Sequence, residues 1–182
     1  MVELEPPLCQ QRIAPVIALY DEAHLNDSRN FPQDGAKSQL NKAFWREKTL
    51  AQMSVQEWES LCDGCGKCCL YKLEDEDTGE ILYTGVACKL LDIERCRCTH
   101  YRQRCDLVPE CLDLRRGFDQ FRWLPATCAY RLLAQGEDLR AWHPLISGRA
   151  ESVHEAGVSV RSFAIPESQV KDLTDHVIEW LD

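Results

Sequence analysis

The first half of the chain alternates short apolar stretches with polar ones, which predicts short helices and one hairpin. Apolar residues recur at helical spacing over residues 13–24 and predict a first helix. Residues 54–57 read Ser-Val-Gln-Glu, a capping box in which the serine and glutamate side chains satisfy free amides at a helix start. In the helix that follows, Val55, Trp58 and Leu61 are expected to share one buried face.

A β-hairpin is predicted next. The apolar stretches 70–73 and 81–84 flank the acidic run 75–80, a pattern typical of two strands joined by a turn. The carboxylates of this run lack the spacing and the closing glutamate of an EF-hand, so we interpret it as a solvated turn. Residues 88–111 show little periodicity and are predicted to be loop.

The second half of the chain predicts further helices and one short strand. Helices are expected around residues 114–121 and from residue 125 or 126 to 135, where Gly136 is the stop signal. A helical turn is expected over residues 151–156, and a short strand over residues 158–160.

These elements divide the chain into three parts: an N-terminal extension over residues 1–43, a cysteine-bearing domain over residues 44–161, and an amphipathic helix over residues 162–182 that packs on the domain. The expected fold class is α+β, in a small, loop-rich, metal-stapled domain with helices flanking the cysteine-rich segment and a short β-hairpin inside it. The apolar positions that predict the last helix are Val170, Leu173, Val177 and Leu181.

The cysteines are concentrated in the middle of the chain, at a density that a hydrophobic core does not need. Ten of the eleven lie between residues 62 and 128, and only Cys9 lies outside. Four fall within residues 62–69, which read Cys-Asp-Gly-Cys-Gly-Lys-Cys-Cys. We predict that the ten are metal ligands: Cys62, Cys65, Cys68, Cys69, Cys88, Cys96, Cys98, Cys105, Cys111 and Cys128.

Two cysteines separated by two residues place both sulfurs on one ion within a single tight turn. Gly64 and Gly66 suit such a turn because they adopt a positive φ without a Cβ penalty, and backbone amides near the sulfurs tune a bound metal. Lys67, Lys72 and Lys89 lie close in sequence and could offset the negative charge of four thiolates. Since zinc takes four cysteines, the ten can fill two such sites at most.

An iron–sulfur cluster is the alternative cofactor. Cys62, Cys65 and Cys68 repeat the first three ligands of a bacterial ferredoxin run. Residue 72, where the fourth ligand would stand, is lysine, so a remote cysteine would have to close the cluster. The neighbours Cys68 and Cys69 do not easily bind the same ion, which favours two sites that share this segment.

Other candidate residues have structural interpretations. His100, two residues after Cys98, is the best histidine candidate for a ligand, whereas His143 and His154 fit capping or packing roles. The four arginines between residues 95 and 104 are interpreted as charge compensation for thiolates. The chain contains no glycine-rich phosphate loop and no nucleophile-elbow motif, so no catalytic residue is predicted.

The net charge and the N-terminal sequence limit which classes of partner and which cellular compartment we expect. The net charge of −9 argues against nucleic acid and anionic membranes as partners, because a protein that binds either one needs a surplus of lysine and arginine. No apolar run reaches the ~18–20 residues that span a bilayer. The first residues lack the basic and apolar regions of a signal peptide, so we place the chain in the reducing cytoplasm. The expected partners are a metal ion and an unidentified protein.

Several groups of residues match the pattern of one known family. They are residues 44–45, 58, 62–69, 73–76, 87–92, 96–98, 108–111, 123–125, 127–133, 142–145 and 153–157. With them the chain resembles the bacterial cysteine-cluster proteins described as zinc- or iron-chelating, with the pattern C-x-x-C-x-x-C-C (YkgJ-like), and within these the YcgN-like subgroup. The resemblance covers residues 44–161. It is weakest at residues 101–105, where the family's proline is absent, so Cys105 is the least supported ligand.

The resemblance implies metal chelation and no established reaction. We therefore predict a cytoplasmic protein that chelates a zinc ion, or iron, through clustered thiolates at a structural site. Two alternatives stay open. One is an iron–sulfur protein with a 4Fe-4S cluster, active in electron transfer or redox sensing, and the other is a thiol-based enzyme or redox sensor without metal.

Overall fold

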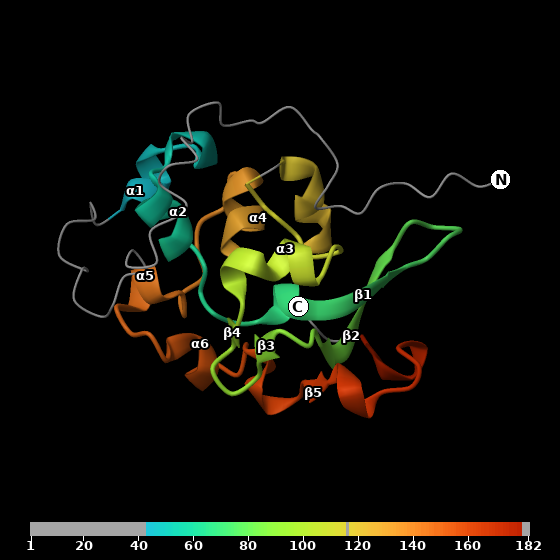
Figure 1. Ribbon diagram of the computed structural model, residues 1–182. Helices are drawn as coiled ribbons and strands as arrows, with labels where there is room; N and C mark the ends of the chain where they lie inside the picture. Colours follow the sequence, from blue (N-terminus) through green and yellow to red (C-terminus); the bar gives the residue numbers. More distant parts are fainter. Residues whose placement is uncertain (1–42, 116, 180–182) are drawn as a thin grey trace.

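The computed structural model describes residues 43–115 and 117–179. The predicted helix over residues 13–24, and the N-terminal extension apart from Ala43, lie outside the described residues. Figure 1 shows helices α1, α2 and α4 on one side of the molecule and the β1–β2 hairpin on the other. The chain that links α2 to β1 runs between them. The architecture is α+β, as predicted.

The elements are short and follow one another closely along the chain. The helices, with 3₁₀ helices labelled η, are α1 (Phe44–Glu47), η2 (Leu50–Gln52), α2 (Val55–Ser60), η3 (Lys67–Cys69), η4 (Tyr101–Gln103), α3 (Arg104–Leu107), η5 (Phe118–Trp123), α4 (Ala129–Ala134), α5 (Pro144–Ser147), α6 (Ser152–Glu155), η6 (Val160–Ser162), η7 (Glu167–Gln169) and η8 (Thr174–His176). The strands are β1 (Leu70–Glu74), β2 (Ile81–Ala87), β3 (Leu91–Asp92), β4 (Arg97–Cys98), β5 (Ile165–Pro166) and β6 (Val177–Ile178). None of the helices in the described ranges is both long and apolar enough to cross a bilayer.

Helix α2 begins at the predicted capping box. The Ser54 hydroxyl accepts a hydrogen bond from the Glu57 N–H at 3.3 Å, and the Glu57 carboxylate accepts one from the Ser54 N–H at 2.8 Å. Trp58 and Leu61 are buried as predicted, but Val55 is 43% exposed, so the predicted shared face is wrong at this residue. The buried residues of this six-residue helix are Glu57 and Trp58.

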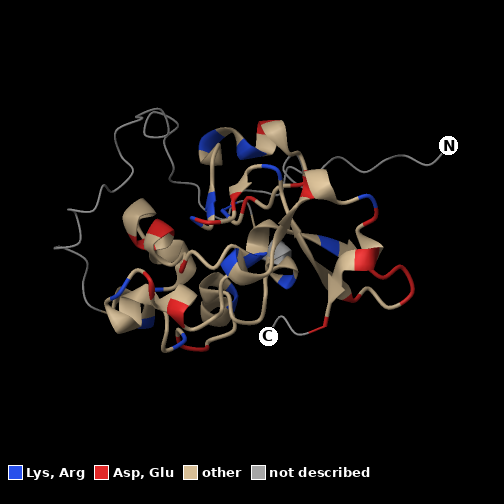
Figure 2. Ribbon diagram, turned by 90° about the horizontal axis from the view of Figure 1, so that it is seen from below, with Lys and Arg blue, Asp and Glu red and all other residues tan. Residues whose placement is uncertain are grey.

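The predicted hairpin is confirmed. Strand β1 pairs antiparallel with β2, and Lys72 lies opposite Tyr83. The Asp75 carboxylate accepts hydrogen bonds from the backbone N–H groups of Asp77 and Thr78, so it shapes the connecting turn. Figure 2 shows the acidic residues along this loop at the edge of the molecule, in keeping with a solvated turn.

The predicted C-terminal amphipathic helix is wrong. Residues 165–166 form β5, parallel to β2, and residues 177–178 form β6, antiparallel to β2. Between them, the Asp172 carboxylate accepts hydrogen bonds from the Thr174 N–H and hydroxyl, a local turn that competes with a helix. Both short strands of this segment therefore pair with β2. This tertiary pairing overrides the helical spacing of the apolar residues in the sequence.

Three smaller predictions change in detail. Helix α4 begins at Ala129, later than predicted, because Cys128 has extended backbone angles, and it ends before Gly136 as predicted. The predicted strand over residues 158–160 is wrong: Val160 begins a 3₁₀ turn, because its N–H donates to the Cys65 carbonyl at 2.8 Å. The helix expected around residues 114–121 is η5, a 3₁₀ helix that starts later. The predicted helical turn over residues 151–156 is present as α6.

The buried apolar residues form two clusters, with the cysteine-bearing segment between them in the sequence. The first cluster joins α1, α2, η5 and α4, and the second joins the sheet to η6. The first contains Phe44, Trp45, Leu50, Met53, Trp58, Leu61, Phe121, Leu124, Ala129, Tyr130 and Leu139. The second contains Leu70, Ala87, Cys96 and Val160, with partly buried neighbours that include Tyr83 and Phe163.

Replacing Phe44 with alanine should strongly destabilise the first cluster. Phe44 is fully buried and packs edge-to-face on Trp45, with ring centroids 5.5 Å apart. We expect the free energy of unfolding, measured by urea denaturation, to fall by about 3–5 kcal/mol. The control Val55→Ala, at a position 43% exposed, should cost much less. Equal losses for the two variants would contradict this account of the core.

Candidate metal centre

The turn over residues 62–69 is shaped by one carboxylate and two glycines. The Asp63 carboxylate accepts a hydrogen bond from the Cys65 N–H at 3.0 Å. Gly64 and Gly66 hold positive φ angles of 78° and 77°, as the sequence predicted. In this region only glycine avoids a Cβ penalty, so both positions favour the residue present. The turn therefore returns the chain on itself within a few residues and gathers its thiols.

Four thiols influence one another at this turn. We call them the first thiol set: Cys62, Cys65, Cys68 and Cys128. Burial raises the pKa of Cys62 and of Cys65 well above the usual range, and the negative charge of Cys68 raises both further. Burial also raises the pKa of Cys128 to about 12, again with a contribution from Cys68. The Gly64 N–H donates to the Cys62 sulfur, so an amide donor is present as expected.

Cys128 reaches the turn from a remote part of the chain, at the start of α4. The Tyr130 hydroxyl donates to the Trp58 carbonyl at 2.9 Å, and the centroids of the two rings lie 4.9 Å apart. Both side chains are buried. Their contact holds the start of α4 against the end of α2, next to Cys62. Tyr130 is therefore a positioning residue that the sequence analysis missed, although its place two residues after Cys128 is a weak signal.

The second thiol set is Cys69, Cys88, Cys98 and Cys111. Its members come from the end of η3, the turn after β2, strand β4 and the turn after α3. The Cys88 N–H donates to the Cys69 carbonyl at 2.9 Å, and Cys98 pairs with Leu91 in the β3–β4 ladder. Burial raises the pKa of Cys111 to about 11, and the charges of Cys68, Cys88 and Cys98 raise it further. The turn and the ladder thus join the backbone of Cys69 to Cys88 and that of Leu91 to Cys98.

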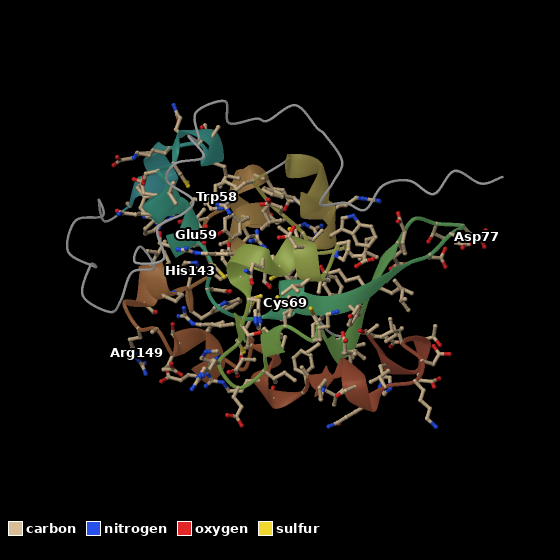
Figure 3. The ribbon with its side chains drawn as sticks, viewed as in Figure 1. Trp58, Glu59, Cys69, Asp77, His143 and Arg149 are labelled. Carbon is tan, nitrogen blue, oxygen red and sulfur yellow. The ribbon has the colours of Figure 1, made fainter. Side chains whose placement is uncertain are left out.

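The two sets meet at neighbouring residues, Cys68 and Cys69. Their sulfurs are 3.9 Å apart. The hydrogen bond from Cys69 lowers the pKa of Cys68 to about 7, against the effect of burial and with help from the charge of Lys72. The same hydrogen bond and burial raise the pKa of Cys69. Cys68 is therefore the member of the pair that carries negative charge first. Figure 3 shows Cys69 near the middle of the molecule.

Lys72 supplies positive charge to both sets. Its ammonium donates to the Cys68 carbonyl at 2.9 Å and to the Leu70 carbonyl at 2.7 Å, and lies 5.3 Å from the centroid of the Tyr83 ring. The thiols that act electrostatically on Lys72 include Cys68 and Cys111, one from each set. The charge compensation expected from the sequence is thus present at this lysine.

Of the four arginines between residues 95 and 104, Arg104 lies beside a thiol. Its guanidinium donates to the Tyr101 carbonyl at 2.8 Å, stacks 4.3 Å from the Tyr101 ring centroid and lies 3.4 Å from the Asp113 carboxylate. Its charge lowers the pKa of Cys111, although burial raises that pKa more. The others are exposed: Arg95, Arg97 and Arg102. Compensation of thiolate charge therefore fits Arg104.

Two of the ten predicted ligands lie in neither set. Cys96 is 5% exposed and belongs to the second apolar cluster. Its φ of 50° is positive, its thiol donates to the Ile93 carbonyl at 3.3 Å, and the Ser159 side chain is hydrogen-bonded to its sulfur. Cys105 is disulfide-bonded. Both nevertheless lie beside other parts of the cysteine-bearing segment: a Cβ on Gly66 would lie 3.7 Å from the Cys96 sulfur, and the Cys105 sulfur lies 3.9 Å from the Cys111 carbonyl.

His143, His100 and His154 differ in burial and in their hydrogen bonds. His143 is 2% exposed, its Nε2 lies 2.9 Å from the Leu61 carbonyl, and its Nδ1 accepts a hydrogen bond from the Leu145 N–H at 3.1 Å. It therefore caps α5 and packs, as expected. His100 is exposed. Within the described chain the Nδ1 of His154 is buried without a hydrogen-bond partner. Figure 3 shows His143 on the same side of the molecule as Trp58.

In their present positions, no three Cys, His, Asp or Glu side chains of residues 43–115 and 117–179 converge closely enough to hold one ion. The chemistry of the donors nevertheless fits a thiophilic metal. Nine cysteines of the described chain are free thiols, an amide donates to the Cys62 sulfur, and Lys72 and Arg104 interact electrostatically with several of the thiols. Binding would therefore require the thiol side chains to close around the metal.

The fold and the two thiol sets define a small α+β protein of the cysteine-cluster class. A family model described as "CxxCxxCC: Putative zinc- or iron-chelating domain" matches residues 61–129. A UPF0260 protein of Rhizobium johnstonii is 54% identical over 140 residues, which are 75% of this chain and 89% of that protein. The UPF0260 protein YcgN of Escherichia coli is also 54% identical over 140 residues, 76% of this chain and 92% of that protein.

The chain therefore belongs to the UPF0260 family of cysteine-cluster proteins, as its motif predicted. The matched part includes the cysteine-bearing part of the chain. The names of these relatives give a family number and state no activity. No solved structure matches the chain.

Gly64 and Gly66 allow a matched test of the turn. A Cβ on Gly66 would meet a Val160 side-chain carbon at 2.7 Å, whereas a Cβ on Gly64 would meet open space. Both alanine variants should lose about 1–2 kcal/mol from the left-handed backbone. We expect Gly66→Ala to lose about 1–3 kcal/mol more through overpacking. Urea unfolding of the two variants checks this, and a Gly64→Ala variant that is as unstable as Gly66→Ala would disprove the close packing.

Proposed function

We propose that this protein binds a zinc ion through thiolates, and that the first thiol set holds it. One observation carries the proposal. Three cysteines of one turn and Cys128 from a remote helix interact electrostatically, and negative charge on Cys68 raises the pKa of the other three. Buried thiols with raised pKa values stay protonated on their own, whereas a bound dication displaces the protons and balances the thiolates.

Zinc suits this donor set because it takes four cysteines in tetrahedral geometry. The Tyr130–Trp58 contact supports the choice of Cys128 as the fourth ligand, since it holds the start of α4 beside the turn. An ion there would tie α2 to α4 and add its binding free energy to folding. We therefore infer a structural role, in a module that presents its surface to a protein partner.

An iron–sulfur cluster is the second candidate. Cys62, Cys65 and Cys68 lie in one run, and Cys128 could serve as the remote fourth ligand that the ferredoxin comparison requires. Amide donors to the sulfurs, as at Cys62, also suit such a cluster. This candidate implies electron transfer or redox sensing.

A thiol-based enzyme or sensor is the third candidate, and it rests on Cys68. This residue is exposed, and the hydrogen bond from Cys69 lowers its pKa to about 7. Thiols of this kind react fast with electrophiles. We place the protein in the cytoplasm because nine of the ten cysteines of the described chain are free thiols and Cys105 alone of these ten is disulfide-bonded, a balance that suits a reducing compartment.

Metal analysis separates the three candidates. Protein purified without oxygen should contain zinc and show no visible absorption band, measured by mass spectrometry of the metals and by absorption spectroscopy. Iron with sulfide and a broad band near ~400 nm would favour the cluster. If neither metal is present and all thiols react freely, metal binding is refuted and the thiol-based function becomes the leading candidate.

A pair of cysteine variants tests the first thiol set. Cys128→Ala should lose one equivalent of zinc per chain, because the ion loses the ligand that closes its coordination. Cys96→Ala, at a buried thiol outside both sets, should keep the full metal content. Metal content after gel filtration is the measurement, and circular dichroism reports whether each variant folds. Full zinc retention by Cys128→Ala would rule out Cys128 as a ligand.

A further inference from the structure

We propose that residues 100–111 form a strap that opens and closes beside the cysteine turn over residues 62–69, and that a polar latch centred on Glu59 holds it closed. The strap comprises η4, α3 and the turn that follows them. Such a strap controls access to the thiols of the turn whichever ligand they hold. It therefore goes beyond the proposed function and does not depend on zinc.

The strap is fixed at both ends and is poorly packed between them. Before it, the Thr99 N–H donates to the Leu90 carbonyl at 2.8 Å. After it, Leu112 and Leu114 pack against the first apolar cluster. None of residues 100–111, all of which the structure describes, is buried, and Leu107 is 43% exposed. Segments that bury so little apolar surface open more readily than the core does.

Glu59, near the end of α2, is the fixed side of the latch. Its Oε2 accepts a hydrogen bond from the Tyr101 hydroxyl at 3.1 Å, and its Oε1 lies 3.7 Å from a guanidinium nitrogen of Arg115. Its own carbonyl accepts the N–H of Cys62 at 3.4 Å. The latch therefore begins on the residue that also fixes the first cysteine of the turn.

Arg104 ties the strap to the anchored segment that follows it. Its guanidinium lies 3.4 Å from the Asp113 carboxylate, donates to the Tyr101 carbonyl and stacks on the Tyr101 ring. The same carboxylate lies 3.8 Å from Arg115, so the contacts form a closed circuit. The side chains of Arg104 and Asp113 are only 11% and 16% exposed. Solvent and salt screen such a pair less than they screen an exposed one.

The charges of the latch balance one another. Glu59 and Asp113 supply two negative charges, and Arg104 and Arg115 supply two positive ones. A network that is already neutral gains little from a further ion, so its arrangement favours a mechanical role over anion binding. Removal of one charge leaves a half-buried partner unpaired, which weakens the hold on the strap.

Opening of the strap changes the surroundings of the turn. Cys111 ends the strap, and its N–H donates to the Val108 carbonyl at 2.9 Å. The charges of Arg104 and Cys68 both act on the Cys111 thiol. An open strap carries Cys111 and Arg104 away from the turn, so the latch determines which thiols and charges face it.

Amide hydrogen exchange of the full-length protein tests the strap. The protein is kept reduced, because Cys105 on the strap is disulfide-bonded and the bond would add a restraint of its own. The strap reporters are the N–H groups of Val108 and Cys111, and the core reporter is that of Leu132 in α4. The strap reporters should exchange at least about tenfold faster than the core reporter. Equal protection of all three would overturn the proposal.

Two variants test the latch. Glu59→Gln removes one charge with little change of shape, and Tyr101→Phe removes the hydroxyl but keeps the ring that stacks on Arg104. Each should speed exchange of the strap reporters by about threefold to tenfold, because one polar contact of the closed strap is lost. The exchange of the core reporter should stay unchanged.

Glu155→Gln is the matched control, since it breaks an exposed ion pair with Arg149 that lies outside the strap. It should leave the strap reporters unchanged. If Glu59→Gln and Tyr101→Phe have no more effect than this control, the latch does not hold the strap and the proposal is refuted. A parallel rise in strap and core exchange would also refute it, because the strap would then open only when the whole domain unfolds. Zinc content, measured on the same samples, tests the proposed function separately.

Discussion

The constraint on which this structure depends is the crowding of thiols where the apolar core is thin. Among the described residues the buried apolar side chains form two clusters, one around α1, α2 and α4 and one against the sheet. The cysteine-bearing segment links them in sequence. Crowded thiols oppose one another's ionisation, so the pKa of most of them is raised by burial and by neighbouring thiolates. A cation is the simplest way to relieve that repulsion and tie the two parts together.

The local features of the turn over residues 62–69 also fix the positions of its cysteines. Gly64 and Gly66 let the chain reverse, and the absence of a Cβ on Gly66 lets Val160 approach. The N–H of Val160 in turn donates to the Cys65 carbonyl, so the C-terminal part of the domain holds the turn in place. Lys72 stands where the two thiol sets meet and interacts electrostatically with both. A small number of backbone contacts thus sets the positions of many thiols.

Sequence reasoning succeeded where the information is local. The capping box at Ser54, the hairpin with its Asp75 turn and the positive φ of the two glycines all depend on residues within a few positions of one another. The family was also predictable, because the C-x-x-C-x-x-C-C motif is specific. The C-terminal helix was wrongly predicted because the partner that makes Val177 a strand residue, Thr84 on β2, is far away in sequence.

The grouping of the cysteines could not be read from spacing for the same reason. Cys96 and Cys98 look equivalent in a Cys-x-Cys pair, yet the positive φ of Cys96 accompanies its burial in the second apolar cluster, whereas Cys98 joins the β3–β4 ladder. The hydrogen bond from Tyr130 to Trp58, residues 72 positions apart, helps to hold Cys128 beside the first turn. Such choices depend on tertiary contacts that a single sequence does not reveal.

The central claim is that thiolates alone surround the metal. X-ray absorption spectroscopy at the zinc edge, on protein purified without oxygen, tests it most directly, because it counts the sulfur neighbours of the ion. Our account predicts four sulfur atoms at about 2.3 Å and no nitrogen or oxygen in the first coordination sphere. A first sphere dominated by nitrogen or oxygen would contradict it, because the thiols of both sets would then stand apart from the metal.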